Sequence, residues 1–303
     1  MTRIQANGIE LTYQWHGDPT NPVIVGVVGL SDQLISWPSS LIDEFVGAGY
    51  SFLAFDSRDT GLSTHFDEAP VGDIGKVLSG DELFEHPYGL IDLARDTTAL
   101  MDGLSIERAH IMGYSMGGAV AQLALAQRPE LFVSFVSIFS TSYAPGLSGR
   151  DDDVNRRMMA CAATDISPAE WVSRMDHLLE RVHGRHFQFD DALDATPEKL
   201  VARRFDSTGM ARHVLAIFEH RMNPPLDQLA AIAAPTLIIN SDDDCLFGLD
   251  HGEDLQQRIP GSTLVAVEGS GHALCHAVGA TLAQAIIPHV NAAQQRNDRL
   301  NAE

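Results

Sequence analysis

The pentapeptide Gly113-Tyr114-Ser115-Met116-Gly117 constrains the fold of this 303-residue chain more than any other stretch. A short apolar run at residues 111–112 leads into it, and residues 119–127, which follow, are rich in good helix formers. The pattern predicts a strand, a sharp turn and a helix, with a serine at the apex of the turn. The glycines let strand and helix approach closely, and the helix N-terminus favours negative charge beside the serine hydroxyl.

The rest of the chain supplies further strand and helix patterns around this turn. Continuous apolar runs at residues 22–28, 51–55, 131–139, 236–240 and 262–267 are typical of strands buried on both faces. Helical spacing separates them at residues 38–48, 88–104, 250–259 and 277–293. Residues 3–6 and 9–15 alternate in polarity around Asn7-Gly8, which indicates an antiparallel hairpin. We therefore predict an α/β fold, with a mostly parallel eight-stranded sheet flanked by helices.

Residues 142–225 have a different character. Charged, helical patterns occur at residues 156–163, 168–182, 197–205 and 210–221, with no strand-like run between them. We predict a helical lid over residues 142–225, inserted before the strand at 236–240. The core is then made of residues 1–141 and 226–303. Residues 66–87 are acidic and rich in helix breakers, so we expect an irregular surface loop there.

A serine nucleophile needs a base to accept its proton, and the base is a histidine oriented by an acid. After Ser115, acids follow the strand at 236–240 in the cluster Asp242, Asp243 and Asp244. A histidine, His272, follows the strand at 262–267. The carboxyl ends of parallel strands meet at one edge of a sheet, and the order Ser, Asp, His suits such a site. The sequence therefore predicts a catalytic serine hydrolase site at this edge.

The sequence also allows alternative roles for some of these residues. His276, one helical turn beyond the predicted base, is the rival histidine. The three aspartates could instead bind a divalent cation, but no second carboxylate cluster clearly accompanies them, so we expect no metal. An oxyanion hole needs two backbone donors, for which we predict the N–H groups of Met116 and Leu30, with Ser31 as the alternative to Leu30.

A polar turn follows the strand at 51–55 and contains Asp56, Arg58 and Asp59. We interpret it as structural, with the arginine paired to a carboxylate and fixing the loop beside the nucleophile. Residues 151–153, a run of three aspartates, read as the solvated start of a helix.

Composition limits the partners. The net charge of −21 argues against nucleic acid and anionic membranes. The three cysteines, Cys161, Cys245 and Cys275, are too few and too scattered for a disulfide framework. We found neither an apolar signal segment nor a run that could span a bilayer, and we expect a cytoplasmic protein. The sequence leaves the oligomeric state open, a homodimer included.

These motifs together resemble the α/β-hydrolase superfamily, over about residues 9–290. More narrowly, FDSRDTG at 55–61, HPYG at 86–89 and GHAL at 271–274 are similar to the aclacinomycin methylesterase type of esterase. The resemblance implies Ser115 as nucleophile, Asp244 as acid and His272 as base. It also implies that the lid sets substrate preference. The chain departs from the family in having Val28-Gly29 where His-Gly is common, and Cys245 where a proline usually follows the acid.

We therefore predict a carboxylic ester hydrolase that forms an acyl-serine intermediate on a small to medium ester, without a cofactor. A C–C bond hydrolase, a lactonase or a cofactor-free perhydrolase could use the same residues. A non-catalytic ligand receptor on this fold is the alternative from another class. The sequence does not specify the acyl or alcohol group.

Overall fold

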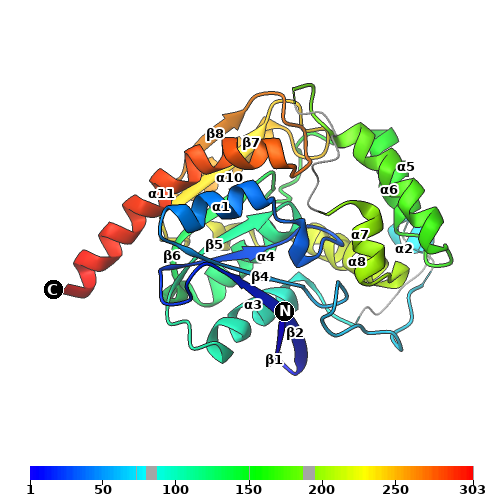
Figure 1. The fold of residues 1–303 in the computed structure, drawn as a ribbon. Helices are drawn as coiled ribbons and strands as arrows, with labels where there is room; N and C mark the ends of the chain where they lie inside the picture. The colour runs from blue at the N-terminus through cyan, green and yellow to red at the C-terminus, as the bar shows by residue number, and fades with distance from the viewer. Residues whose placement is uncertain (73, 80–86, 150, 187–194, 303) are drawn as a thin grey trace.

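A single sheet runs through the computed structural model, which describes all residues except 73, 80–86, 150, 187–194 and 303 (Figure 1). Its strands lie in the order β1-β2-β4-β3-β5-β6-β7-β8. In chain order they are β1 (Thr2–Ala6), β2 (Ile9–His16), β3 (Val23–Val27), β4 (Ser51–Phe55), β5 (Ala109–Tyr114), β6 (Phe132–Ile138), β7 (Thr236–Ser241) and β8 (Thr263–Val267). The β1–β2 and β2–β4 pairs are antiparallel and the other pairs are parallel, which confirms the predicted mostly parallel eight-stranded sheet.

The central strands are apolar along their whole length because both of their faces are covered. In β4, Phe52 and Ala54 belong to one hydrophobic cluster and Leu53 and Phe55 to the other, as the two-residue period of a strand requires. Helices α1 (Ser39–Gly47) and α11 (His276–Ala302) pack on the first cluster. Helices α3 (Leu90–Gly103), α4 (Met116–Gln127) and α10 (Leu249–Arg258) pack on the second. The sheet is therefore the middle of three layers.

The N-terminal hairpin turns at the predicted place. Asn7 and Gly8 both have positive φ angles, 49° and 77°, which two-residue hairpin turns of this hand need. The ladder between β1 and β2 closes at the Ala6–Ile9 pair.

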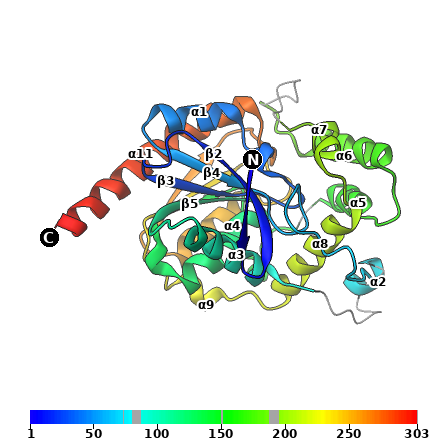
Figure 2. The ribbon, with the colours of Figure 1, turned by 60° about the horizontal axis from the view of Figure 1, so that its bottom comes forward.

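The described part of residues 142–225, between β6 and β7, forms four helices: α5 (Asp152–Cys161), α6 (Pro168–Val182), α7 (Pro197–Arg203) and α8 (Ser207–Met222). Each begins after a residue whose side chain accepts hydrogen bonds from the first turn, namely Asp151, Ser167, Thr196 and Asp206. Figures 1 and 2 show these helices gathered on one side of the sheet, away from the projecting end of α11. The predicted helical character of this segment is confirmed in its described residues.

The structure differs from the sequence prediction in several places. A short helix, α2 (Ile74–Ser79), interrupts the segment expected to be irregular, because Ile74 is buried in a cluster with residues of α5 and α8. Residues 73 and 80–86 of that segment lie outside the described residues. Helix α11 runs nine residues beyond the expected end at 293, and a four-residue helix, α9 (Leu226–Leu229), precedes β7. Short 3-10 turns occur at Leu34–Ser36 and Pro129–Leu131.

Among the helices that the structure describes, none has the combination of length and apolar character needed to cross a membrane.

Candidate active site

Ser115 lies at the turn between β5 and α4 in a backbone conformation that side chains rarely adopt, with φ 54° and ψ −120°. Its N–H donates to the carbonyl of Ile138 on the neighbouring strand at 2.9 Å. A Cβ on Gly117 would lie 2.1 Å from the Val27 carbonyl oxygen, and one on Gly113 would lie 2.3 Å from the Gly117 carbonyl oxygen. The elbow can therefore form only because both positions are glycine.

The structure brings the predicted base and acid to this serine. Nε2 of His272, in the loop after β8, lies 2.9 Å from the Ser115 hydroxyl oxygen, and Nδ1 lies 2.8 Å from a carboxylate oxygen of Asp244, after β7. The other Asp244 oxygen accepts from the N–H groups of Leu246 and Phe247, at 2.7 and 3.0 Å. Asp244 and His272 are both buried. This chain of contacts can take a proton from the serine and hold the resulting charge on the imidazole.

The other two aspartates of the cluster have different partners. Asp242 accepts from the N–H of Gly269 at 2.7 Å and from the guanidinium of Arg185, and Asp243 accepts from the backbone N–H of Arg185 at 2.6 Å. They thus fix the loop that leads to the histidine instead of contacting its ring. The rival His276, at the start of α11, lies 3.4 Å from the hydroxyl of Ser39.

A tyrosine that the sequence did not single out holds the histidine loop. The hydroxyl of Tyr114, the residue before the nucleophile, donates to the carbonyl of His272 at 2.6 Å. The N–H of His272 donates to the carbonyl of Val182 at the end of α6, at 2.8 Å. The position of the imidazole is therefore set by both β5 and the inserted helices.

The predicted oxyanion donors surround the nucleophile. Leu30, Ser31 and Met116 line the same cavity as Ser115. Ser31 has a φ angle of 57°, so the loop turns sharply at this point. Within the described part of the chain, the backbone N–H groups of all three meet no protein acceptor. They are thus available to a substrate oxygen, and Leu30 and Ser31 both remain candidates for the second donor.

The cavity over Ser115 encloses about 120 Å³. Its far wall is apolar and comes largely from the helices between β6 and β7, with Met158 of α5, Met175 and Leu178 of α6, and Met210 of α8. Methionine side chains adapt to ligands of varied shape. The cavity therefore combines the polar groups around Ser115 with an apolar wall that these helices supply.

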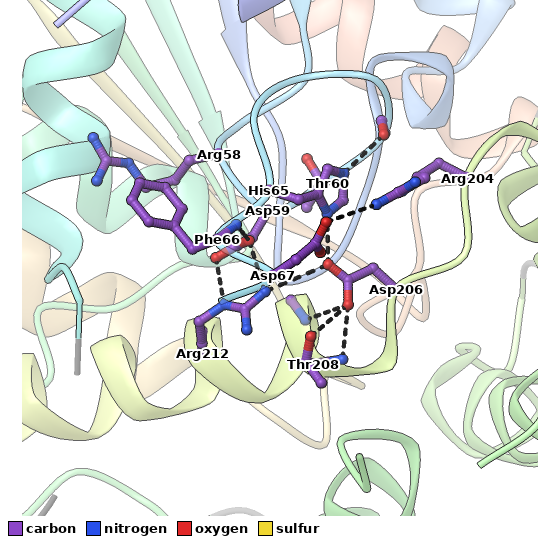
Figure 3. Close-up of polar contacts among 12 residues, drawn as sticks. Arg58, Asp59, Thr60, His65, Phe66, Asp67, Arg204, Asp206, Thr208 and Arg212 are labelled. Atoms are coloured by element: carbon purple, nitrogen blue, oxygen red, sulfur yellow. Dashed lines mark hydrogen bonds and ion pairs between the residues drawn. The ribbon is translucent and has the colours of Figure 1, made fainter. Parts of the chain in front are cut away.

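Buried ion pairs join the turn after β4 to its surroundings. Arg58 forms two hydrogen bonds with Asp96 of α3, at 2.6 and 2.7 Å, as the sequence predicted for this arginine. Asp56 pairs with Arg203 of α7. Asp59 pairs with Arg212 of α8 (Figure 3). These last two pairs connect the core to the inserted helices, and no sequence signal identifies the partner arginines.

Asp59, His65 and Asp206 bring possible metal-ligand atoms within 4.8 Å of one another. The positive charge at this place already comes from Arg212, which donates to both Asp59 oxygens at 2.8 Å (Figure 3). Burial acts to raise the pKa of Asp59, but the hydrogen bonds from Arg212 and Tyr88 outweigh it and hold the pKa below its usual range. The geometry therefore fits an ion-pair network better than a cation site.

Comparison with known proteins places these features in a wider group. The sequence model of the alpha/beta hydrolase fold family matches residues 22–276. The rhodomycin D methylesterases DnrP of Streptomyces peucetius and DauP of Streptomyces sp. (strain C5) are each 28% identical to this chain, over 91% of it and 93% of their own length.

Solved structures share the fold. A thermophilic esterase from Thermogutta terrifontis superimposes with a TM-score of 0.74 at 16% identity, covering 97% of this chain and 99% of its own. The meta-cleavage product hydrolase of Pseudomonas fluorescens has a TM-score of 0.74 at 17% identity, with coverage of 97% and 98%.

Proposed function

Because this chain belongs to the alpha/beta hydrolase fold family, we propose that it hydrolyses carboxylic esters through an acyl-serine intermediate on Ser115. The single observation that carries the proposal is the pair of contacts made by His272, 2.9 Å to Ser115 and 2.8 Å to Asp244. The relatives named as methylesterases support an ester as the substrate.

The reaction follows from the roles that these positions allow. Ser115 Oγ attacks the ester carbonyl while Nε2 of His272 takes its proton. Asp244 accepts a hydrogen bond from Nδ1 of His272 and stabilises the imidazolium. The carbonyl oxygen becomes an oxyanion and accepts hydrogen bonds from Met116 and from Leu30 or Ser31. His272 then gives its proton to the departing alcohol, and a water molecule repeats the sequence to release the acid.

We assign residues 142–225 as a lid that selects the substrate, with the core in residues 1–141 and 226–303. Support comes from the methionine and leucine side chains that α5, α6 and α8 place over Ser115. We also place the protein in the cytoplasm, since no disulfide joins Cys161, Cys245 and Cys275.

The test uses chromogenic esters and a phosphonate that labels activated serines. Ser115→Ala should lower kcat by on the order of 10⁴ or more and abolish labelling. Esters of graded acyl and alcohol length would then define the preferred substrate. Near-normal turnover by the Ser115→Ala variant would contradict the proposal.

A further inference from the structure

Asp32 occupies a position for which the proposed reaction has no use. It follows the predicted oxyanion residues Leu30 and Ser31, and it lines two adjoining cavities. One cavity contains Ser115 and His272, and the other extends toward the N-terminus of α11. Both cavities share Tyr114, Met175 and Leu179 with Asp32, so the carboxyl group lies on their common wall.

The charge on Asp32 has no fixed counter-ion. Among the described residues that line either cavity, Asp32 is the only Asp, Glu, Lys or Arg. The hydroxyl of Ser36 and the backbone N–H of Gly29 hydrogen-bond to it. No lysine or arginine of the described chain forms an ion pair with it. Burial raises its pKa to about 6, against the opposing effects of Ser36 and His272. At neutral pH it is therefore mainly a carboxylate facing apolar walls.

An aromatic ring lies beside this carboxylate. Asp32 and Tyr114 line both cavities, and they approach each other across Gly29, where an added Cβ would lie 2.9 Å from Oδ2 of Asp32 and 3.0 Å from two ring carbons of Tyr114. Met175 and Leu179 complete the surroundings with apolar surface. A carboxylate, an aromatic ring and an apolar wall together suit an alkylated ammonium group, which has positive charge but little need for hydrogen bonds.

We propose that Asp32 is a specificity-determining residue that selects esters bearing a quaternary or protonated tertiary ammonium group. The ammonium group sits against Asp32 and Tyr114 while the ester carbonyl lies at Ser115. This inference rests on the proposed ester hydrolysis and specifies in addition that the substrate is positively charged.

The experiment compares esters that differ only in a charged nitrogen. For a cation in the alcohol part, the pair is butanoylcholine and 3,3-dimethylbutyl butanoate. For a cation in the acyl part, it is ethyl 4-(trimethylammonio)butanoate and ethyl 5,5-dimethylhexanoate. We expect kcat/KM to favour the cationic member of one pair at least tenfold, and Asp32→Asn to reduce that ratio at least tenfold.

A matched control distinguishes the effect of the Asp32 charge on the kcat/KM ratio from the effect of the protein's net negative charge. Glu44→Gln removes one negative charge from the exposed face of α1 and should leave the ratio unchanged. An unchanged ratio in Asp32→Asn, or an equal loss for both members of a pair, would overturn the inference.

Binding provides a readout that does not depend on turnover. The Ser115→Ala variant should bind the cationic member of the preferred pair at least tenfold more tightly than the neutral one, by calorimetry. Equal affinities would overturn the inference even if Asp32→Asn does not fold. If wild-type protein hydrolyses neither pair and none of the graded chromogenic esters, the proposed function fails. Calorimetry with both cationic esters and their neutral counterparts then still decides whether Asp32 binds ammonium groups.

Discussion

Arg212→Met should be among the most destabilising single substitutions in this protein. Arg212 of α8 donates through Nε and one terminal nitrogen to the two carboxylate oxygens of Asp59, each at 2.8 Å. Both side chains are almost inaccessible, at 1% and 0% exposure. Methionine keeps most of the aliphatic stem, so the change removes the charge and the hydrogen bonds with little loss of volume.

The magnitude follows from what remains around Asp59. Among the described residues, its carboxylate would keep the hydroxyl of Tyr88 and the N–H of Phe66 as donors. A buried charge that loses its partner costs about 3–5 kcal/mol of stability. We therefore expect the free energy of unfolding to fall by about 3–5 kcal/mol. The double variant Asp59→Asn/Arg212→Met should recover part of this loss, because it leaves no uncompensated charge.

Urea denaturation followed by circular dichroism measures the change. The control is Arg95→Met on α3, which breaks an exposed pair with Asp92 and should cost about 1 kcal/mol or less. A loss for Arg212→Met no larger than that of the control would refute the reasoning, as would a double variant less stable than Arg212→Met alone. Because α8 also supplies Met210 to the cavity wall, KM should rise in the Arg212→Met variant.

Three further predictions concern the catalytic contacts and the lid. Asp244→Asn should lower kcat by about 10³- to 10⁴-fold, because an amide cannot stabilise the charged imidazole, whereas Asp242→Asn should have a mild effect. Gly117→Ala should destabilise the fold by about 3 kcal/mol or more, since its Cβ meets a backbone carbonyl that cannot move aside. Burial acts to lower the pKa of His65, but the Asp206 carboxylate, 2.5 Å from Nδ1, outweighs burial and raises the pKa. The charged pair therefore stabilises the fold fully below about pH 6.5, and this stabilisation is lost as the pH rises through the raised pKa. His65→Gln should therefore flatten the decrease in stability above that pH.

Each of these three predictions can be tested directly. Steady-state kinetics on one activated ester compares the two aspartate variants, and a larger loss in Asp242→Asn would move the acid to that residue. Gly47→Ala, where a Cβ meets nothing within 4 Å, is the control for Gly117→Ala and should keep or raise the wild-type urea midpoint. Urea midpoints at pH 6 and pH 8 test His65, and the same pH dependence in His65→Gln and wild type would exclude the proposed pair.

The sequence predicted the sheet and the elbow well because their signals are local. A strand buried on both faces must be apolar along its length, as at residues 51–55, and a turn as tight as that at Ser115 needs glycine at both 113 and 117. The placement of groups at one edge then follows from parallel strands, which bring the ends of β5, β7 and β8 together. These steps need no knowledge of long-range contacts.

The remaining features depend on contacts that no local pattern encodes. Among three adjacent aspartates, only the direction of each side chain distinguishes Asp244 from Asp242, and that direction is set by the turn after β7. Helix α2 forms where Ile74 packs into a hydrophobic cluster with residues of α5 and α8. These residues are 80 or more positions away in the chain. Arg203 and Arg212 look like ordinary charged residues of amphipathic helices until the fold buries them.

Asp32 differs from the buried acids of this protein that form ion pairs with basic side chains. In the described chain, Asp56, Asp59 and Asp96 each have an arginine, and Asp244 has His272. Burying a carboxylate without a cation costs free energy. An acid without a cation in the protein is therefore stabilised by other contacts within the protein or by a cationic ligand that binds to it. Asp32 accepts hydrogen bonds from the Ser36 hydroxyl and the Gly29 N–H, both uncharged, and lies on the wall of the cavity that holds Ser115. A cationic substrate would complete at Asp32 the same pairing that the arginines provide elsewhere, and this is the physical basis for expecting charge selectivity from a site whose other walls are apolar.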